Sequence, residues 1–138
     1  MSYDLAVFDP DTAPKERKAF LIWFGEMTEW AESHGYDDPT VTTPNLRALF
    51  MEMITTFPAM NGPFSKEELP VDEASLTDYC VGKSLIYVGF SWSKADEAHP
   101  HLLQLAEKYK VGFFNVSSDE SDVWLPNKDE KLVLAHSN

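Results

Sequence analysis

The sequence predicts an α+β domain in which three helices accompany a mainly antiparallel sheet of about four strands, in the order β-α-α-β-α-β-β. The segment 84–92 alternates between two rows of side chains, as a strand does. The segments 14–34 and 44–57 instead carry apolar residues at intervals of three and four, which is the helical period. At 138 residues the chain has the length of a single domain.

The segment 84–92 is expected to be the central strand. Its stronger apolar row contains Ile86, Val88, Phe90 and Trp92, and the opposite row is still mostly apolar. A strand with two apolar rows is covered on both faces, so helices should lie on at least one side. Gly89 has no side chain, and we therefore expect a helix or another part of the chain to approach closely there.

The first strand and the first helix are predicted near the amino terminus. Tyr3–Phe8 alternates in the manner of a strand. Helix A starts around Pro14 and continues to about His34, where Gly35 supplies a left-handed stop. Leu21 and Ile22 lie outside its apolar stripe, which suggests that part of its other side is also buried.

Helix B begins at Pro44, after the capping residue Thr43, and ends at Pro58. A connection of about eight residues predicts that helices A and B pack as an antiparallel pair. From Pro58 to Gly82 the periodicity lapses, and a long loop is expected.

The last third of the chain contains helix C, a hairpin and a tail. Helix C spans 93–110, and Pro100 either kinks it or divides it into two pieces. Segments 111–116 and 122–125 predict a hairpin at the carboxyl edge of the sheet. Residues 1–126 are thus expected to form one α+β domain, followed by a charged tail, 127–138, in which 132–134 either adds a short strand or stays mobile.

The composition restricts the classes of partner. Acidic residues outnumber basic ones by 23 to 11, and the net charge is -12. Nucleic acid and anionic membranes would be repelled, whereas a basic protein would be attracted; the charge can also serve solubility alone. The lone cysteine, the lack of a signal peptide and the lack of an apolar run of about 18 residues suit a soluble cytoplasmic protein.

No catalytic, metal or cofactor site is expected. His99 and His101 would point to different sides of a helix, which makes them a poor chelate. His34 is interpreted as a partner for the last carbonyls of helix A. Cys80 is either a small buried side chain or a nucleophile whose base the sequence does not identify.

Acidic loops are the predicted partner-binding sites. One group lies in the loop 58–82 and the other in the turn 117–121 with its flank, where an exposed turn is the simpler reading. The eight candidate residues are Glu67, Glu68, Asp72, Glu73, Asp78, Asp119, Glu120 and Asp122.

Five sequence segments resemble a known family: Met1–Phe8, Thr28–Tyr36, Met60–Pro63, Gly89–Trp92 and Val111–Ser118. Together they resemble a family of small acidic bacterial cytoplasmic proteins associated with immunity proteins, which neutralise secreted antibacterial toxins. The resemblance covers residues 1 to about 126 and transfers no catalytic residue.

The resemblance implies a binding protein, without enzymatic activity, that blocks a cognate toxin through its acidic loops. Basic clefts are common in toxins that act on nucleic acids, and an acidic domain would be steered toward such a cleft. Two alternatives stay open. The first is a small enzyme or ligand-binding domain whose pocket lies between helices A and B and the sheet and uses His34, Tyr36 or Cys80. The second is an interaction module without any toxin. The oligomeric state is left undetermined.

Overall fold

The fold is given by a computed structural model, which describes residues 2–60, 62, 64 and 73–138. Its helices are α1 (Arg17–Met27), α2 (Pro44–Thr56) and α3 (Ala95–Lys108), with short 3-10 turns at Pro39–Val41, Glu73–Ser75 and Trp92–Lys94. Its strands are β1 (Tyr3–Phe8), β2 (Asp78–Val81), β3 (Leu85–Phe90), β4 (Gly112–Phe114), β5 (Val123–Pro126) and β6 (Leu132–His136).

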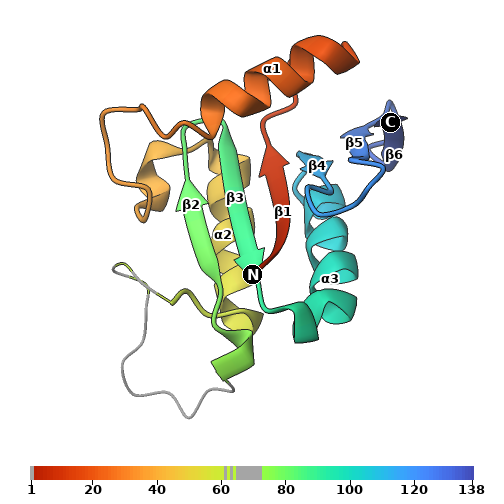
Figure 1. The fold of residues 1–138 in the computed structure, drawn as a ribbon. Coiled ribbons are helices and arrows are strands. Elements are labelled where there is room, and N and C mark those ends of the chain that lie inside the picture. The colour runs from red at the N-terminus through yellow and green to blue at the C-terminus, as the bar shows by residue number, and fades with distance from the viewer. Residues whose placement is uncertain (1, 61, 63, 65–72) are drawn as a thin grey trace.

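The fold is α+β, with three helices and an antiparallel sheet, as the sequence predicts. The strand count is wrong, however, because the sheet has six strands in the order β2-β3-β1-β4-β5-β6. The two additional strands, β2 and β6, form its edges (Figure 1). The hairpin of β4 and β5 is present, but it is not the edge of the sheet.

Helices cover both faces of the sheet, which explains the two apolar rows. On one face Leu5 and Val7 of β1 pack with α2 and α3, and on the other Ala6 and Phe8 pack with α1. Helices α1 and α2 therefore lie on opposite sides, and the expected antiparallel pair of helices A and B is wrong. Each apolar face of the sheet must be covered by a helix, and this requirement, rather than the short connection between α1 and α2, determines where the two helices pack.

Helix α1 is shorter than its periodic pattern suggests. It ends at Met27, and the hydroxyl of Thr28 donates to the carbonyls of Phe24 (2.9 Å) and Gly25 (3.2 Å). Trp30 then adopts a left-handed conformation with φ of 54°, which turns the chain back toward the sheet. Its ring packs against Tyr36 and Tyr87, so tertiary packing, rather than Gly35, sets the end of the helix.

Strand β2 occupies part of the segment that the sequence predicts to be a loop. It forms a hairpin with β3, closed by a bond from the Gly82 amide to the Leu85 carbonyl (2.7 Å). The Thr77 amide donates to the Pro58 carbonyl (2.9 Å), which ties the end of α2 to the start of β2. The intervening residues 61, 63 and 65–72 lie outside the described part of the chain.

Two further expectations concern Trp92, which follows β3, and Pro100, which lies inside helix α3. The alternating pattern predicts that Trp92 lies in the buried row of the strand, but β3 ends at Phe90 and Trp92 is 50% exposed. Of the two alternatives for Pro100, division of the helix is wrong, because α3 runs through it from Ala95 to Lys108. No helix in the described ranges has the length and apolar character needed to cross a membrane.

Candidate binding site on the open face of the sheet

Three neighbouring strands bring two carboxylates and a glycine into one row. Asp4 of β1 and Asp78 of β2 both lie opposite Gly89 of β3. Residues opposite each other in an antiparallel sheet point to the same face, which here is the α1 face. A Cβ atom at Gly89 would lie 3.5 Å from Oδ1 of Asp4 and 3.6 Å from Ser2, so Gly89 leaves space between the two carboxylates.

This row forms the floor of an open hollow of about 470 Å³, which we call the acidic hollow. Figure 1 shows α1 across the upper end of the sheet, while the lower ends of β2, β3 and β1 have no described helix in front of them. Of the helix or other chain segment expected close to Gly89, the described residues provide no helix, and the side chains of Asp4 and Ser2 are the nearest neighbours. The lining contains three carboxylates and, within the described ranges, no basic side chain: Ser2, Asp4, Met60, Glu73, Leu76, Asp78, Tyr87, Gly89, Phe90 and Ser91.

The carboxylate of Asp4 is held in one orientation. Tyr87 Oη donates to its Oδ2 (2.5 Å), and Ser2 Oγ donates to its Oδ1 (2.5 Å). The Asp4 amide also donates to Oγ of Ser117 (2.8 Å). Burial raises the pKa of Tyr87, and its bond to Asp4 raises it further, so the phenol remains a hydrogen-bond donor at neutral pH. Asp4 is thus a pre-organised acceptor at the floor of the acidic hollow.

A second hollow, of about 440 Å³, adjoins the first beneath α1. Asp78 and Tyr87 line both hollows. Burial, followed by the charge of Asp78, raises the pKa of Cys80 to about 11, so its thiol is protonated at neutral pH and provides no thiolate nucleophile. The complete lining of this second hollow consists of Phe24, Thr28, Trp30, Asp78, Cys80 and Tyr87.

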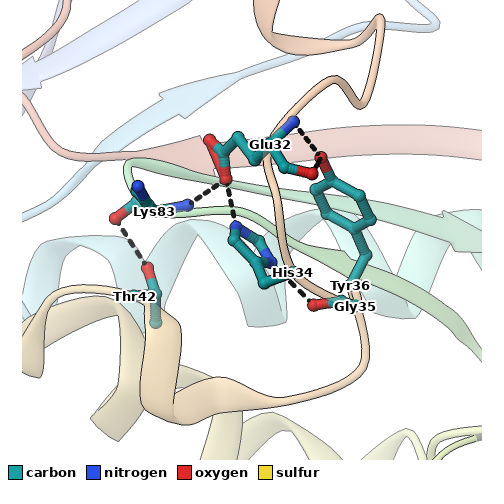
Figure 2. Close-up of polar contacts among 6 residues, drawn as sticks. All are labelled: Glu32, His34, Gly35, Tyr36, Thr42 and Lys83. Carbon is teal, nitrogen blue, oxygen red and sulfur yellow. Dashed lines mark hydrogen bonds and ion pairs between the residues drawn. The ribbon is translucent and has the colours of Figure 1, made fainter.

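The loop after α1, which carries Trp30 and Tyr36, is fastened to the turn between β2 and β3 (Figure 2). Oε1 of Glu32 accepts bonds from the His34 ring (2.5 Å) and from the Lys83 amide (3.0 Å). The Glu32 amide donates to Tyr36 Oη (2.7 Å), and Thr42 Oγ1 donates to the Lys83 carbonyl (3.2 Å). These bonds fix this rim of the sheet face.

His34 belongs to this loop and not to the end of a helix. Its Nδ1 faces the Gly35 carbonyl (2.7 Å) and its Nε2 faces Glu32. The expected contact with the last carbonyls of helix A is therefore wrong, because α1 ends at Met27. Two acceptors around one ring favour the doubly protonated imidazolium.

We expect the pKa of His34 in the folded protein to lie above about 6.5, the value of an unperturbed histidine. The Gly35 carbonyl is the main cause, and the bond and charge of Glu32 add to it. The stability that protonated His34 contributes to the fold is fully present below pH about 6.5 and is lost as the pH rises through the pKa of the folded protein. An NMR titration of the ring signals measures the pKa of His34, and Glu32→Gln should lower the midpoint of that titration.

His136 provides the internal control for this titration. Burial, followed by the charge of Arg17, lowers its pKa. The same experiment should therefore give a midpoint below about 6.5 for His136. A His34 midpoint at or below that of His136 would show that the loop is not held in the manner of Figure 2.

The predicted acidic residues fall into separate places. Glu73 and Asp78 line the acidic hollow. Asp119 and Glu120 are exposed in the turn between β4 and β5. The amide of Ser117, in the same segment, donates to the Asp4 carbonyl, so the turn lies on the side of β1 that faces away from β3. The other four are Asp122, which is half-buried and accepts a bond from Nε1 of Trp124 (2.7 Å), and Glu67, Glu68 and Asp72, which lie outside the described residues.

The expected pocket between helices A and B and the sheet does not form, because α1 and α2 lie on opposite faces. Tyr36 and Cys80 line a hollow of about 310 Å³ beside the edge strand β2, without His34 in its described lining. His99 packs against Phe113 and His101 against Phe57. Among the described residues, no three His, Cys, Asp or Glu side chains converge where a metal ion could bind.

Comparisons of the chain with protein-family models, with curated proteins and with solved structures found no match.

Proposed function

We propose that this chain is a cytoplasmic immunity protein that binds and neutralises a cognate antibacterial toxin, and that the acidic hollow receives a basic side chain of the toxin. The observation that carries the proposal is the row formed by Asp4, Gly89 and Asp78. A lysine or arginine placed over Gly89 would reach a carboxylate on either side. Arginine in particular can form paired hydrogen bonds with carboxylates.

The overall charge supports the same proposal. A net charge of -12 steers a basic partner toward the molecule and accelerates the encounter. The carboxylates of the hollow then act at short range, and the attraction is strengthened most at Asp4, which is half-buried. Steering and docking thus favour the same class of partner.

The rim of the hollow offers apolar anchors for a protein partner. Met60, which lines the hollow, is 50% exposed. Trp92 follows the lining residue Ser91 and is equally exposed, but its ring packs at a centroid distance of 5.1 Å on Tyr3, whose side chain belongs to the α2 and α3 face. Exposed apolar side chains such as Met60 can become anchors when a partner buries them. An acidic floor with an apolar rim suits a protein partner better than a small cation.

Replacement of Asp78 by lysine tests the proposal. Asp78 is exposed, so Asp78→Lys should leave the fold intact. We expect association with the toxin to slow by about tenfold or more, and its dependence on salt to weaken. The toxin would come from the neighbouring reading frame and would be recognised because it kills cells that lack this chain. Stopped-flow association and growth protection are the two measurements.

The matched control is Asp129→Lys, which makes the same change of charge at an exposed residue outside the hollow. It should change the association rate by less than about twofold, because screening limits distant charges. Equal effects of the two variants would show that the hollow is not the contact. The absence of any neighbouring toxin that this chain counteracts would refute the function itself.

A further inference from the structure

Helix α1 carries a second apolar surface that faces away from the sheet. Its inner side is anchored by Phe20, which is 1% exposed, whereas Ile22 is 57% and Leu21 39% exposed. The expectation that Leu21 and Ile22 are partly buried is therefore wrong. A Cβ atom at Gly25 would have no neighbour within 4 Å, so the outer surface is open there as well.

The charges on this outer surface run against the helix dipole. Lys18 lies in the first turn of α1 and Glu26 in the last, and Ile22 is midway between them in a row at i, i+4 and i+8. A helix is stabilised by acidic residues at its start and basic residues at its end, and α1 has the opposite order at these two positions. Neither side chain takes part in the ion pairs found between described residues. The charge order therefore does not stabilise the isolated helix.

This order of charges along α1, basic at the start and acidic at the end, becomes favourable when two copies of α1 lie antiparallel about a two-fold axis through Ile22. Lys18 of each copy then faces Glu26 of the other, because both are four residues from Ile22. Ala19 faces Gly25 in the same way, and these small residues let the helices approach closely. Ile22 of one copy meets Ile22 of the other and is removed from water.

We propose that the outer side of α1 is a homodimer interface of this chain, in which two α1 helices pack antiparallel about Ile22. The interaction is isologous, since the same surface serves in both copies. It does not depend on the proposed function, because the lining of the acidic hollow contains no residue of α1.

The dimer should be weak and dependent on concentration. Helix α1 has 11 residues, so it is about 16 Å long and offers a small contact. Interfaces below about 1,200 Å² are typical of transient complexes, and we expect a dissociation constant of about 10–100 μM. The net charge of -12 opposes association, but at physiological salt it is screened beyond about 8 Å, whereas the paired charges at the interface are in contact.

A charge swap tests the geometry. Sedimentation equilibrium from about 5 to 500 μM should show the monomer of 15.7 kDa passing to a dimer. Lys18→Glu or Glu26→Lys alone places like charges opposite each other and should raise the dissociation constant about tenfold or more. The double variant Lys18→Glu/Glu26→Lys restores opposite charges without a change of net charge. It should return the constant to within about threefold of the original.

Two controls distinguish this interface from association through a different surface of the protein. Lys128→Glu makes the same charge change in the turn before β6 and should leave the dimer intact. Ile22→Gln should weaken the dimer, whereas Met51→Gln, at a 42% exposed position of α2, should not. A protein that stays monomeric throughout the range would overturn the proposal. So would a dimer that is indifferent to the single variants, as pairing through the edge strand β6 would be, or a folded double variant that fails to recover.

Discussion

Replacement of Phe20 by alanine is expected to lower the free energy of unfolding by about 3–5 kcal/mol. Phe20 attaches α1 to its face of the sheet and is 1% exposed. Its ring lies 5.1 Å from that of Phe8 and 5.2 Å from that of Phe114, measured between centroids. Rigid neighbouring rings cannot collapse into the space that the phenyl group leaves, so the variant loses both the burial and the packing.

Urea denaturation followed by circular dichroism measures this loss. The matched variant is Ile22→Ala, in the same helix but 57% exposed, and it should change the unfolding free energy by less than about 0.5 kcal/mol. The protein should be dilute enough to remain monomeric, because Ile22 also belongs to the proposed dimer interface. Equal losses in the two variants would mean that α1 is not anchored through Phe20.

The fold was predictable where local sequence and packing agree. Strand β1 and helix α2 have the expected positions because their apolar periods match the surfaces that they bury. Strand β2 was missed because it has four residues and follows a charged, proline-containing segment. A signal was available, since Tyr79 and Val81 are two positions apart, as apolar residues on one face of a strand are, and Gly82 starts a short turn before the next strand.

The end of helix α1 could not be obtained from periodicity. The apolar pattern continues past Met27 to Trp30, yet the contacts of Trp30 with Tyr36 and Tyr87 favour a turn over another helical residue. Tyr87 is more than 50 positions further along the chain. Long-range packing of this kind overrides local propensity and leaves no local pattern.

The candidate site was hidden for a similar reason. The sequence predicts Asp78 and Glu73 as binding residues from their place in an acidic segment, but it gives Asp4 a place in a strand without a functional role. Only the strand register places Asp4 and Asp78 on either side of Gly89. The glycine indicates a place of close approach, but a short sequence does not show whether a helix or open space lies above it.

Gly112→Ala is the other substitution with a large expected effect, and we expect it to destabilise the fold by about 1–3 kcal/mol or more. A methyl group at Gly112 of β4 would overlap the ring of Phe8, its partner on β1. Phe8 is fully buried, and its ring is confined by Phe20 and Trp23 at centroid distances of 5.1 and 6.0 Å. The ring cannot move without displacing α1 or separating the two strands.

Gly89→Ala is the matched control, since it adds the same atom to another strand of the sheet. Its methyl group would meet Asp4 and Ser2 at ordinary contact distances of 3.5 and 3.6 Å. The variant should be as stable as the original protein or more stable by about 0.5–1 kcal/mol, because alanine has less freedom to lose in a strand than glycine. Thermal and urea unfolding of both variants give the comparison. If Gly112→Ala proved as stable as Gly89→Ala, the close packing of β4 on Phe8 would be wrong, and with it the pairing that positions the β4–β5 turn beside Asp4.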